Sequence, residues 1–134
     1  MKTILIEGNT YQIGILNAFE QLKVARCLTA VSTLIQAMTS DKNKGKDMTF
    51  LVLLMLGELT DADSDFVVHK CLSVIKRQSG ESYAKLTAPS GDLMFQDIGM
   101  KAMIDLTTAV IVENLGDFFS TALSNLESAE RAQV

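Results

Sequence analysis

The sequence is poor in the residue types that build most catalytic and metal sites. Among its 134 residues are one histidine, two cysteines, one proline and no tryptophan. His69 is therefore the one histidine that a cysteine or serine nucleophile could use as a base. On a helix, His69 and Cys71 point about 200° apart and cannot form a local pair, and one histidine with two distant cysteines does not make a tetrahedral zinc site. The sequence predicts neither an enzyme nor a metal centre.

The remaining ligand-binding motifs are incomplete. The acidic stretch 61–65 resembles the start of a calcium loop, but the glycine at the sixth loop position and the glutamate at the twelfth are missing. Segment 40–47 comes nearest to a phosphate-binding loop, yet its first glycine and its final hydroxyl are replaced by Ser40 and Asp47. No cofactor is expected. An enzyme would need a site built from scattered carboxylates such as Glu58, Asp61 and Asp105.

Long apolar runs and an excess of basic charge are also missing. The chain has 12 lysine and arginine residues against 16 aspartate and glutamate residues, which gives a formal net charge of −4 and disfavours binding to phosphate backbones. No run reaches the roughly 18 apolar residues of a membrane-spanning helix, and residues 1–12 do not form a signal peptide. We expect a soluble cytoplasmic protein with no nucleic-acid or membrane partner.

The chain does contain enough apolar material for one core. Hydrophobic residues make up 48% of it and charged residues 21%, which is too apolar a balance for intrinsic disorder. Its length is typical of one domain, so we predict a single domain over residues 1–134, with 127–134 as a flexible tail. Cys27 and Cys71 lie within apolar helical patterns and are expected to be reduced, buried thiols.

A β-hairpin is expected at the N-terminus. Residues 2–13 place apolar side chains on both sides of a Gly-Asn turn, and Ile4 and Ile6 share one strand face. Such a hairpin is not stable alone in water, so it should pack against the helices that follow.

Three helices are predicted next. Asn17 and Glu20 form a capping box that begins the first, which should end near residue 39 or 40, before a solvated loop over 41–47. Its apolar stripe consists of Val24, Cys27, Leu28, Val31, Leu34, Ile35 and Met38. The near-continuous apolar run 48–59 predicts a second helix buried on most sides. A third helix over about 65–78 presents Val68, Cys71, Leu72 and Ile75 on one face.

The C-terminal half predicts a second hairpin and further helix. Segment 82–96 has a turn at Pro89–Gly91 between two short strands. Asp97 or its neighbour caps a helix whose apolar face holds Met100, Met103, Ile104, Val110 and Ile111. Gly116 costs about 1 kcal/mol relative to alanine in a helix and is expected to kink or restart it. The predicted fold class is mainly α, a compact domain of four to five helices with two short hairpins.

Apolar residues near the C-terminus form a candidate partner-binding surface. Methionine adapts to irregular partners, and the chain has seven methionines together with a clean stripe of apolar residues after Gly116. Val112 lies on an otherwise polar helix side. The candidate partner-binding residues are Val112, Leu115, Phe118, Phe119 and Leu123. A purely structural role of the same stripe in the core is the alternative.

The order of three segments resembles a known family. LNAFEQLKVARCL follows the N-terminal hairpin, YAKLTAPSGDLMFQDIGM comes later, and VIVENLGDFFS closes the series. Together they resemble the tail assembly chaperones of long-tailed bacteriophages and prophages, over about residues 2–120. These motifs are structural, so the resemblance carries over no catalytic residue.

The resemblance implies a small, mainly helical protein of the host cytoplasm. It would coat the aggregation-prone tape measure protein while tail-tube subunits assemble, and it would be absent from the mature virion. It also implies self-association, the tail-tube protein as a second partner and, in some members, a longer frameshifted form. The alternative hypothesis is a structural head–tail or tail adaptor that is retained in the virion.

A physical mechanism is compatible with this resemblance. A methionine-rich helical surface can cover apolar stripes of a long partner helix without requiring one sequence. Many copies along one rod gain avidity even where each contact is weak, and the acidic balance of the chain keeps the coated complex soluble.

Overall fold

The fold combines helices with an antiparallel sheet. The computed structural model describes residues 2–29 and 48–132, with side chains at 2–27 and 52–117. The described elements are β1 (Lys2–Ile6), β2 (Asn9–Ile13), α1 (Ala18–Thr29), α3 (Met48–Glu58), α4 (Asp61–Ser73), β3 (Ile75–Ser79), β4 (Ser82–Lys85) and α5 (Met100–Ala132). With four helices and four strands in its described part, the chain is mixed α/β, and the prediction of a mainly α fold is wrong.

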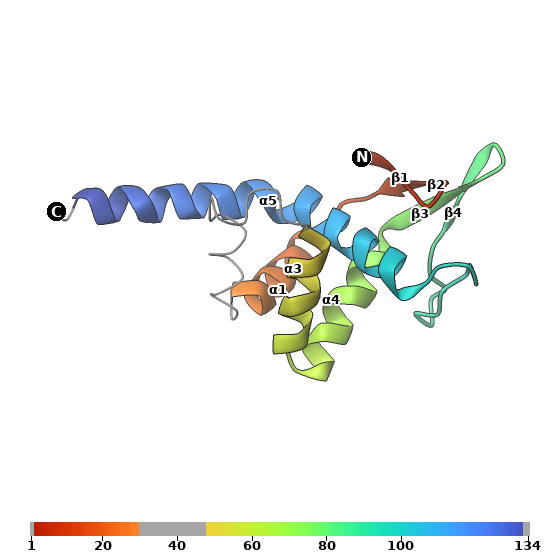
Figure 1. Cartoon of the computed structure of the whole chain (residues 1–134), viewed down its shortest axis with the longest axis horizontal. Helices are drawn as coiled ribbons and strands as arrows, with labels where there is room; N and C mark the ends of the chain where they lie inside the picture. Colours follow the sequence, from red (N-terminus) through yellow and green to blue (C-terminus); the bar gives the residue numbers. More distant parts are fainter. Residues whose placement is uncertain (1, 30–47, 133–134) are drawn as a thin grey trace.

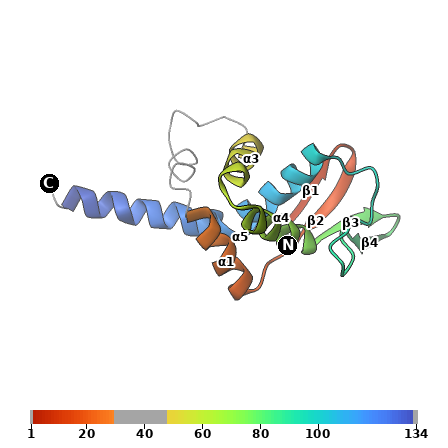
Figure 2. The same ribbon diagram turned by 90° about the horizontal axis from the view of Figure 1, so that it is seen from below.

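The molecule is elongated because α5 extends well beyond the other elements. Figure 1 shows the sheet at one end, α1, α3 and α4 beneath the first half of α5, and the second half of α5 projecting from the other end. The same arrangement is visible from below in Figure 2. The described chain therefore consists of a body, in which the sheet and helices pack together, and the projecting distal part of α5.

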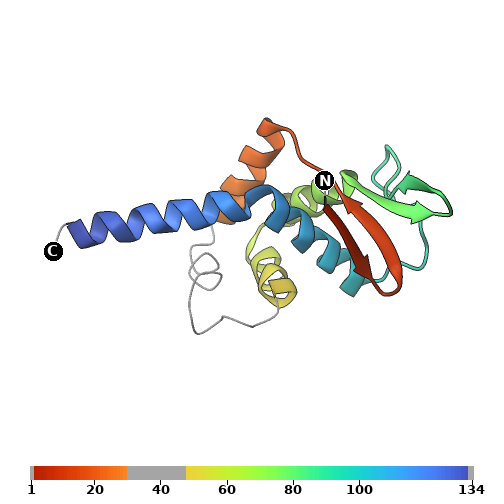
Figure 3. The same cartoon turned by 90° about the horizontal axis from the view of Figure 1, so that it is seen from above.

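The sheet has the strand order β1-β2-β3-β4, with every neighbouring pair antiparallel. The predicted N-terminal hairpin is present, but its turn is formed by Glu7 and Gly8 and not by the predicted Gly8 and Asn9, because Asn9 pairs with Ile6 as the first residue of β2. Glu7 and Gly8 both have positive φ (51° and 83°), as a two-residue turn of type I′ requires. Tyr11 pairs with Arg77, so strands from opposite halves of the chain meet in the centre of the sheet. Figure 3 shows the β1–β2 hairpin beside the first half of α5.

The third predicted helix ends earlier than its apolar periodicity suggests. α4 begins after Thr60, whose hydroxyl accepts a hydrogen bond from the Asp63 backbone N–H at 3.2 Å and caps the helix. It ends at Ser73, and the segment from Ile75 onward pairs with β2 as strand β3. The buried face of α4 consists of Val67, Cys71 and Leu72, whereas Val68 is half-buried. The predicted extension to residue 78 is wrong because strand pairing captures this segment.

The second hairpin is present but is formed by other residues. β3 and β4 are joined by a turn at Gly80, which has φ +65°. The predicted turn at Pro89–Gly91 lies instead in a small loop that is closed by a bridge between Thr87 and Leu93. Residues 79–82 (SGES) and 88–91 (APSG) both contain residues typical of turns. The hairpin turn forms at the earlier segment because the strand before it, β3, pairs with β2.

The remaining helices also differ in part from expectation. α1 has the predicted capping box, since the Glu20 N–H donates to Asn17 Oδ1 at 2.8 Å and the Asn17 N–H donates to Glu20 Oε1 at 3.3 Å. The expected continuation over residues 30–40, with Val31, Leu34, Ile35 and Met38, lies outside the described residues. α3 is buried on one side only, because Leu53 and Leu54 are exposed. α5 is a single helix that passes through Gly116 and through 127–132 without a break.

One apolar cluster connects every layer of the fold. α5 packs against α3 and α4 on one side and against β1 and β2 on the other. The largest fully buried side chains come from strands, helices and the segment after β4, namely Tyr11, Ile13, Met55, Ile75, Leu86, Leu106 and Ile111. Since these residues are contributed from across the sequence, the core forms only when both halves of the chain come together.

Asn114 of α5 holds the centre of the fold through four hydrogen bonds. Its Oδ1 accepts from the Leu16 backbone N–H at 2.8 Å and from Gln21 Nε2 at 3.1 Å. Its Nδ2 donates to the Gly14 carbonyl at 3.2 Å and to the Val110 carbonyl at 2.8 Å. The side-chain amide thus fastens the connection between β2 and α1 to α5, and both of its polar atoms are satisfied.

Replacing Asn114 should destabilise the whole domain. In Asn114→Ala, the backbone groups of Leu16 and Gly14 lose their partners inside the protein, which should lower the free energy of unfolding by about 2–4 kcal/mol. Urea denaturation followed by circular dichroism measures this change. The neighbouring exposed residue supplies the control, since Glu113→Ala should change stability by less than about 0.5 kcal/mol. Equal stabilities of the two variants would contradict the assigned role.

The thiol of Cys71 should react only when the protein unfolds. Both cysteines are free and buried, as predicted, and burial raises the pKa of the Cys71 thiol to about 12. Because the thiolate is the reactive form, Cys71 in Cys27→Ser should react with an aromatic disulfide reagent at pH 8 at a rate that follows unfolding. Rapid reaction of Cys71 in the native protein, with no increase in mild urea, would be inconsistent with its burial.

Candidate functional site

The predicted partner-binding residues divide between two environments. Val112 is exposed on α5, whereas Leu115 is buried in the core. The side chains of Phe118, Phe119 and Leu123 lie outside the described residues, although their backbone belongs to the helical part of α5 that projects from the body. Val112 and Leu115 therefore do not share one surface, and any surface on the distal helix begins where α5 leaves the core.

A second apolar surface, a groove between α3, α4 and the start of α5, was not recognised from the sequence. The groove has a volume of about 580 Å³. Its apolar lining residues are Leu53, Leu56, Val68, Leu72, Leu93, Met100, Met103 and Ile104. Apolar clefts of this size are typical binding sites, so we take this groove as the candidate site.

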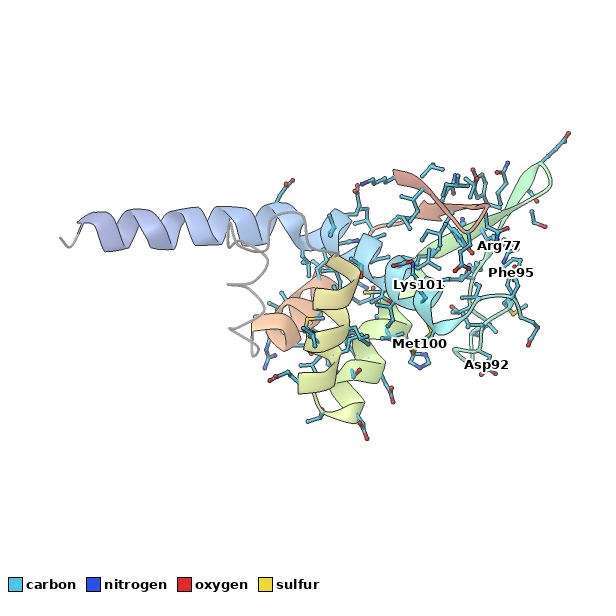
Figure 4. All side chains as sticks on the ribbon, viewed as in Figure 1. Arg77, Asp92, Phe95, Met100 and Lys101 are labelled. Atoms are coloured by element: carbon cyan, nitrogen blue, oxygen red, sulfur yellow. The ribbon has the colours of Figure 1, made fainter. Side chains whose placement is uncertain are left out.

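The groove remains open because two helices carry more apolar side chains than the fold covers. Met100 was expected in the core, but it lies in the first turn of α5 and is 67% exposed. Leu53 belongs to the almost wholly apolar helix α3, of which only one side packs inward. Figure 4 places Met100 at the side of the molecule that carries α3 and α4. The unusual all-round apolarity of α3 was the sequence signal for this surface.

Acidic residues and a close glycine contact define the edge of the groove. Asp65 and Asp92 belong to the lining, and none of the described lining residues is lysine or arginine. At one end Gly91 has φ +94°, and a Cβ atom there would lie 3.2 Å from His69 Nδ1. Glycine is therefore required for the loop to approach α4 this closely. The result is an apolar groove with an acidic rim, which suits a partner with basic flanking residues.

Arg77 holds the loop that forms one wall of the groove. Its guanidinium donates to Asp97 Oδ1 at 2.7 Å and to Oδ2 at 2.9 Å, and it lies 4.5 Å from the centre of the Phe95 ring. Through these two contacts, Arg77 of β3 holds the loop at Phe95 and at Asp97. Figure 4 shows Arg77 and Phe95 side by side. The hydrogen bond from Arg77 lowers the pKa of the Asp97 carboxyl below its usual 3.8. The sequence predicted that Asp97 or its neighbour caps α5. In the structure Asp97 instead anchors the loop through Arg77.

The outward face of α1 is also apolar. Phe19 and Leu22 are exposed about one turn apart on α1, with Phe19 86% exposed, and Ile15 is exposed just before the helix. Phe19 and Leu22 border a hollow of about 380 Å³ that Lys23 and Arg26 also line, and Lys23 Nζ lies 4.1 Å from the centre of the Phe66 ring. These residues lie off the buried stripe of Val24 and Cys27, which is how the sequence could have indicated them.

The residues considered for chemistry lie on several helices of the described fold. His69 is exposed whereas Cys71 is fully buried, so the two are not paired. Glu58, Asp61 and Asp105 lie on different helices, and Asp105 pairs with Lys101 at 3.1 Å. Within residues 2–29 and 48–132, no three histidine, cysteine, aspartate or glutamate side chains could together hold a metal ion. Nor is any described helix long and apolar enough to cross a membrane.

The fold and its surfaces define a small α/β protein with uncovered apolar grooves and helix faces, which is the character of a binding protein. Over residues 7–127 the chain matches the family of phage tail assembly chaperone proteins, and it belongs to that family. No curated protein and no solved structure matches the chain. The resemblance noted in the sequence is thus confirmed at the level of the family.

The groove wall should loosen when the Arg77–Asp97 pair is removed. In Asp97→Asn, the amide of Met94, which donates to the Leu86 carbonyl at 2.8 Å, should exchange its hydrogen faster, because the loop loses a charge-assisted anchor. Hydrogen exchange measured by NMR tests this. Asp92→Asn, in the same loop but outside the pair, should leave the exchange rate unchanged.

The same pair predicts how the loop responds to acid. Since the pKa of Asp97 is depressed in the folded protein, the loop is stabilised at pH values above 3.8 and loses this stabilisation as the pH falls through the lower folded value. The chemical shift of the Asp97 carboxyl carbon itself should therefore stay constant down to about pH 4. A transition centred near pH 6 would contradict this assignment.

Proposed function

We propose that this tail assembly chaperone binds the tape measure protein in the host cytoplasm and leaves before the virion is complete. The observation that carries the proposal is the open apolar groove with its acidic rim, found in a member of the tail assembly chaperone family. Its occupant is an amphipathic helix of the tape measure protein, with its apolar side on Met100 and Leu53 and basic residues toward Asp65 and Asp92.

The energetics favour many weak contacts along a long partner. Full burial of a methionine or leucine side chain contributes roughly 1.5–3 kcal/mol, and both Met100 and Leu53 are already partly covered. One groove therefore supplies modest affinity. Repeated binding along the same rod multiplies it through avidity, and a methionine at the groove mouth accommodates different helix sequences.

The projecting half of α5 is the second binding surface in this proposal. Val112 is exposed on α5, and the helix continues beyond it with the adjacent Phe118 and Phe119 and, about one turn after Phe119, Leu123. Leu115 anchors the beginning of this segment in the core. A helix that extends beyond its own domain can lie along a long helical partner. The proposal includes self-association of the chaperone and the tail-tube protein as a second partner.

The decisive test is co-expression with the tape measure protein and recovery of the complex. The double variant Met100→Asp/Leu53→Asp should weaken capture about tenfold or more, because it removes apolar contacts and adds negative charge to an acidic rim. Met94→Asp is the matched control, since Met94 is 59% exposed and lies outside the groove. It should retain the complex. A second variant, Phe118→Ser/Phe119→Ser, tests the distal helix separately.

Two results would overturn the proposal. The first is an unchanged solubility of the tape measure protein when the chaperone is co-expressed. The second is the presence of the chaperone in purified mature particles, which would instead support a structural adaptor. If both groove and control variants lose binding equally, the groove is not the site.

A further inference from the structure

The outer edge of β1 is open in the described part of the chain. β1 is the first strand of the sheet order β1-β2-β3-β4 and has a strand neighbour only on the β2 side. Its pairing with β2 runs without interruption from Lys2–Ile13 to Ile6–Asn9, so no bulge distorts it. The other edge is partly occupied, because the Met94 N–H donates to the carbonyl of Leu86 just beyond β4.

This edge lacks most of the features that protect edge strands from pairing. Proteins usually protect an open edge with proline, a bulge or central charges. β1 has the sequence KTILI, with its one charge at the end, and Leu5 is 71% exposed. Such a strand favours the addition of another strand.

The hairpin geometry identifies the backbone groups that face outward. In a two-residue hairpin, the residues next to the turn, Ile6 and Asn9, exchange hydrogen bonds, and so does every second pair from there. Ile4 and Lys2 therefore bond to β2. The backbone N–H and C=O groups of Thr3 and Leu5 point to the open edge.

We infer that a second copy of this chain occupies the edge, with two β1 strands antiparallel about a two-fold axis at Ile4. In this register Thr3 of each copy exchanges hydrogen bonds with Leu5 of the other, so all four outward-facing groups of these residues are used. The two sheets become one. This inference deepens the self-association in the proposed function and names its surface.

The charge pattern of the hairpin fits a copy of itself. Lys2 and Glu7 lie at opposite ends of the β1 segment. Antiparallel pairing about Ile4 brings Lys2 of one copy beside the turn that carries Glu7 of the other, and it places no like charges opposite each other. A parallel arrangement would bring the two lysines together. The charges of the hairpin therefore favour the antiparallel pairing over an in-register parallel one.

Charge substitutions at the two outward positions test both the surface and the register. Thr3→Lys/Leu5→Lys and Thr3→Glu/Leu5→Glu place like charges opposite each other and should each weaken dimerisation about tenfold. The matched variant Thr3→Lys/Leu5→Glu places opposite charges in both cross-pairs and should retain the dimer. Sedimentation velocity over a concentration series gives the dissociation constant of each, and circular dichroism confirms that each variant is folded.

Mixing the two weakened variants supplies an independent result. The all-lysine and all-glutamate variants should form a heterodimer, because every cross-strand pair is then of opposite charge. A monomeric native protein, a dimer unaffected by these substitutions, or equal loss in all three double variants would overturn the inference. Capture of the tape measure protein by the groove is measured in the same samples, so failure of the dimer is distinguishable from failure of the proposed function.

Discussion

The fold depends on the hydrogen bonds by which the Asn114 side chain holds the connection between β2 and α1. The backbone turns from β2 into α1 at residues 14–17, and Asn114 binds both ends of this turn from the middle of α5. The same turn reaches the corner between α4 and β3, because the Gly14 N–H donates to the Val74 carbonyl at 2.9 Å. A Cβ atom at Gly14 would lie 2.5 Å from that oxygen. One amide and one glycine therefore bring sheet, α1, α4 and α5 to a common point.

Apolar surface remains uncovered away from this central point. The buried cluster surrounds Asn114, whereas Leu53 on α3 and Met100 in the first turn of α5 are exposed. The lining of the groove is mainly apolar and includes the two carboxylates of Asp65 and Asp92. The exposed surface is suited to covering another protein, in accordance with the family.

The sequence predicted correctly those elements that a few neighbouring residues determine. The capping box of Asn17 and Glu20 was confirmed, and so was the N-terminal hairpin, because a turn or cap is determined by a few neighbouring residues. The sequence IKRQS continues the apolar period of α4 and was assigned to a helix, but its state is decided by pairing with β2 from the other half of the chain. Met100 fits the stripe of α5 equally well, and its exposure depends on where α3 and α4 end. Long-range pairing is what the periodicity of a single segment cannot show.

The positions of the surfaces connect the two proposals. The groove is formed by α3, α4 and the start of α5, whereas the β1 edge belongs to the sheet on the other side of α5. A contact along β1 therefore leaves the groove accessible, and two joined copies present two grooves to one rod-like partner. The second groove then binds at the effective concentration set by the dimer, which raises affinity without a new kind of contact. Because a five-residue strand pair buries little surface, the proposed dimer would be weak, and a repetitive partner would shift its equilibrium toward assembly by mass action.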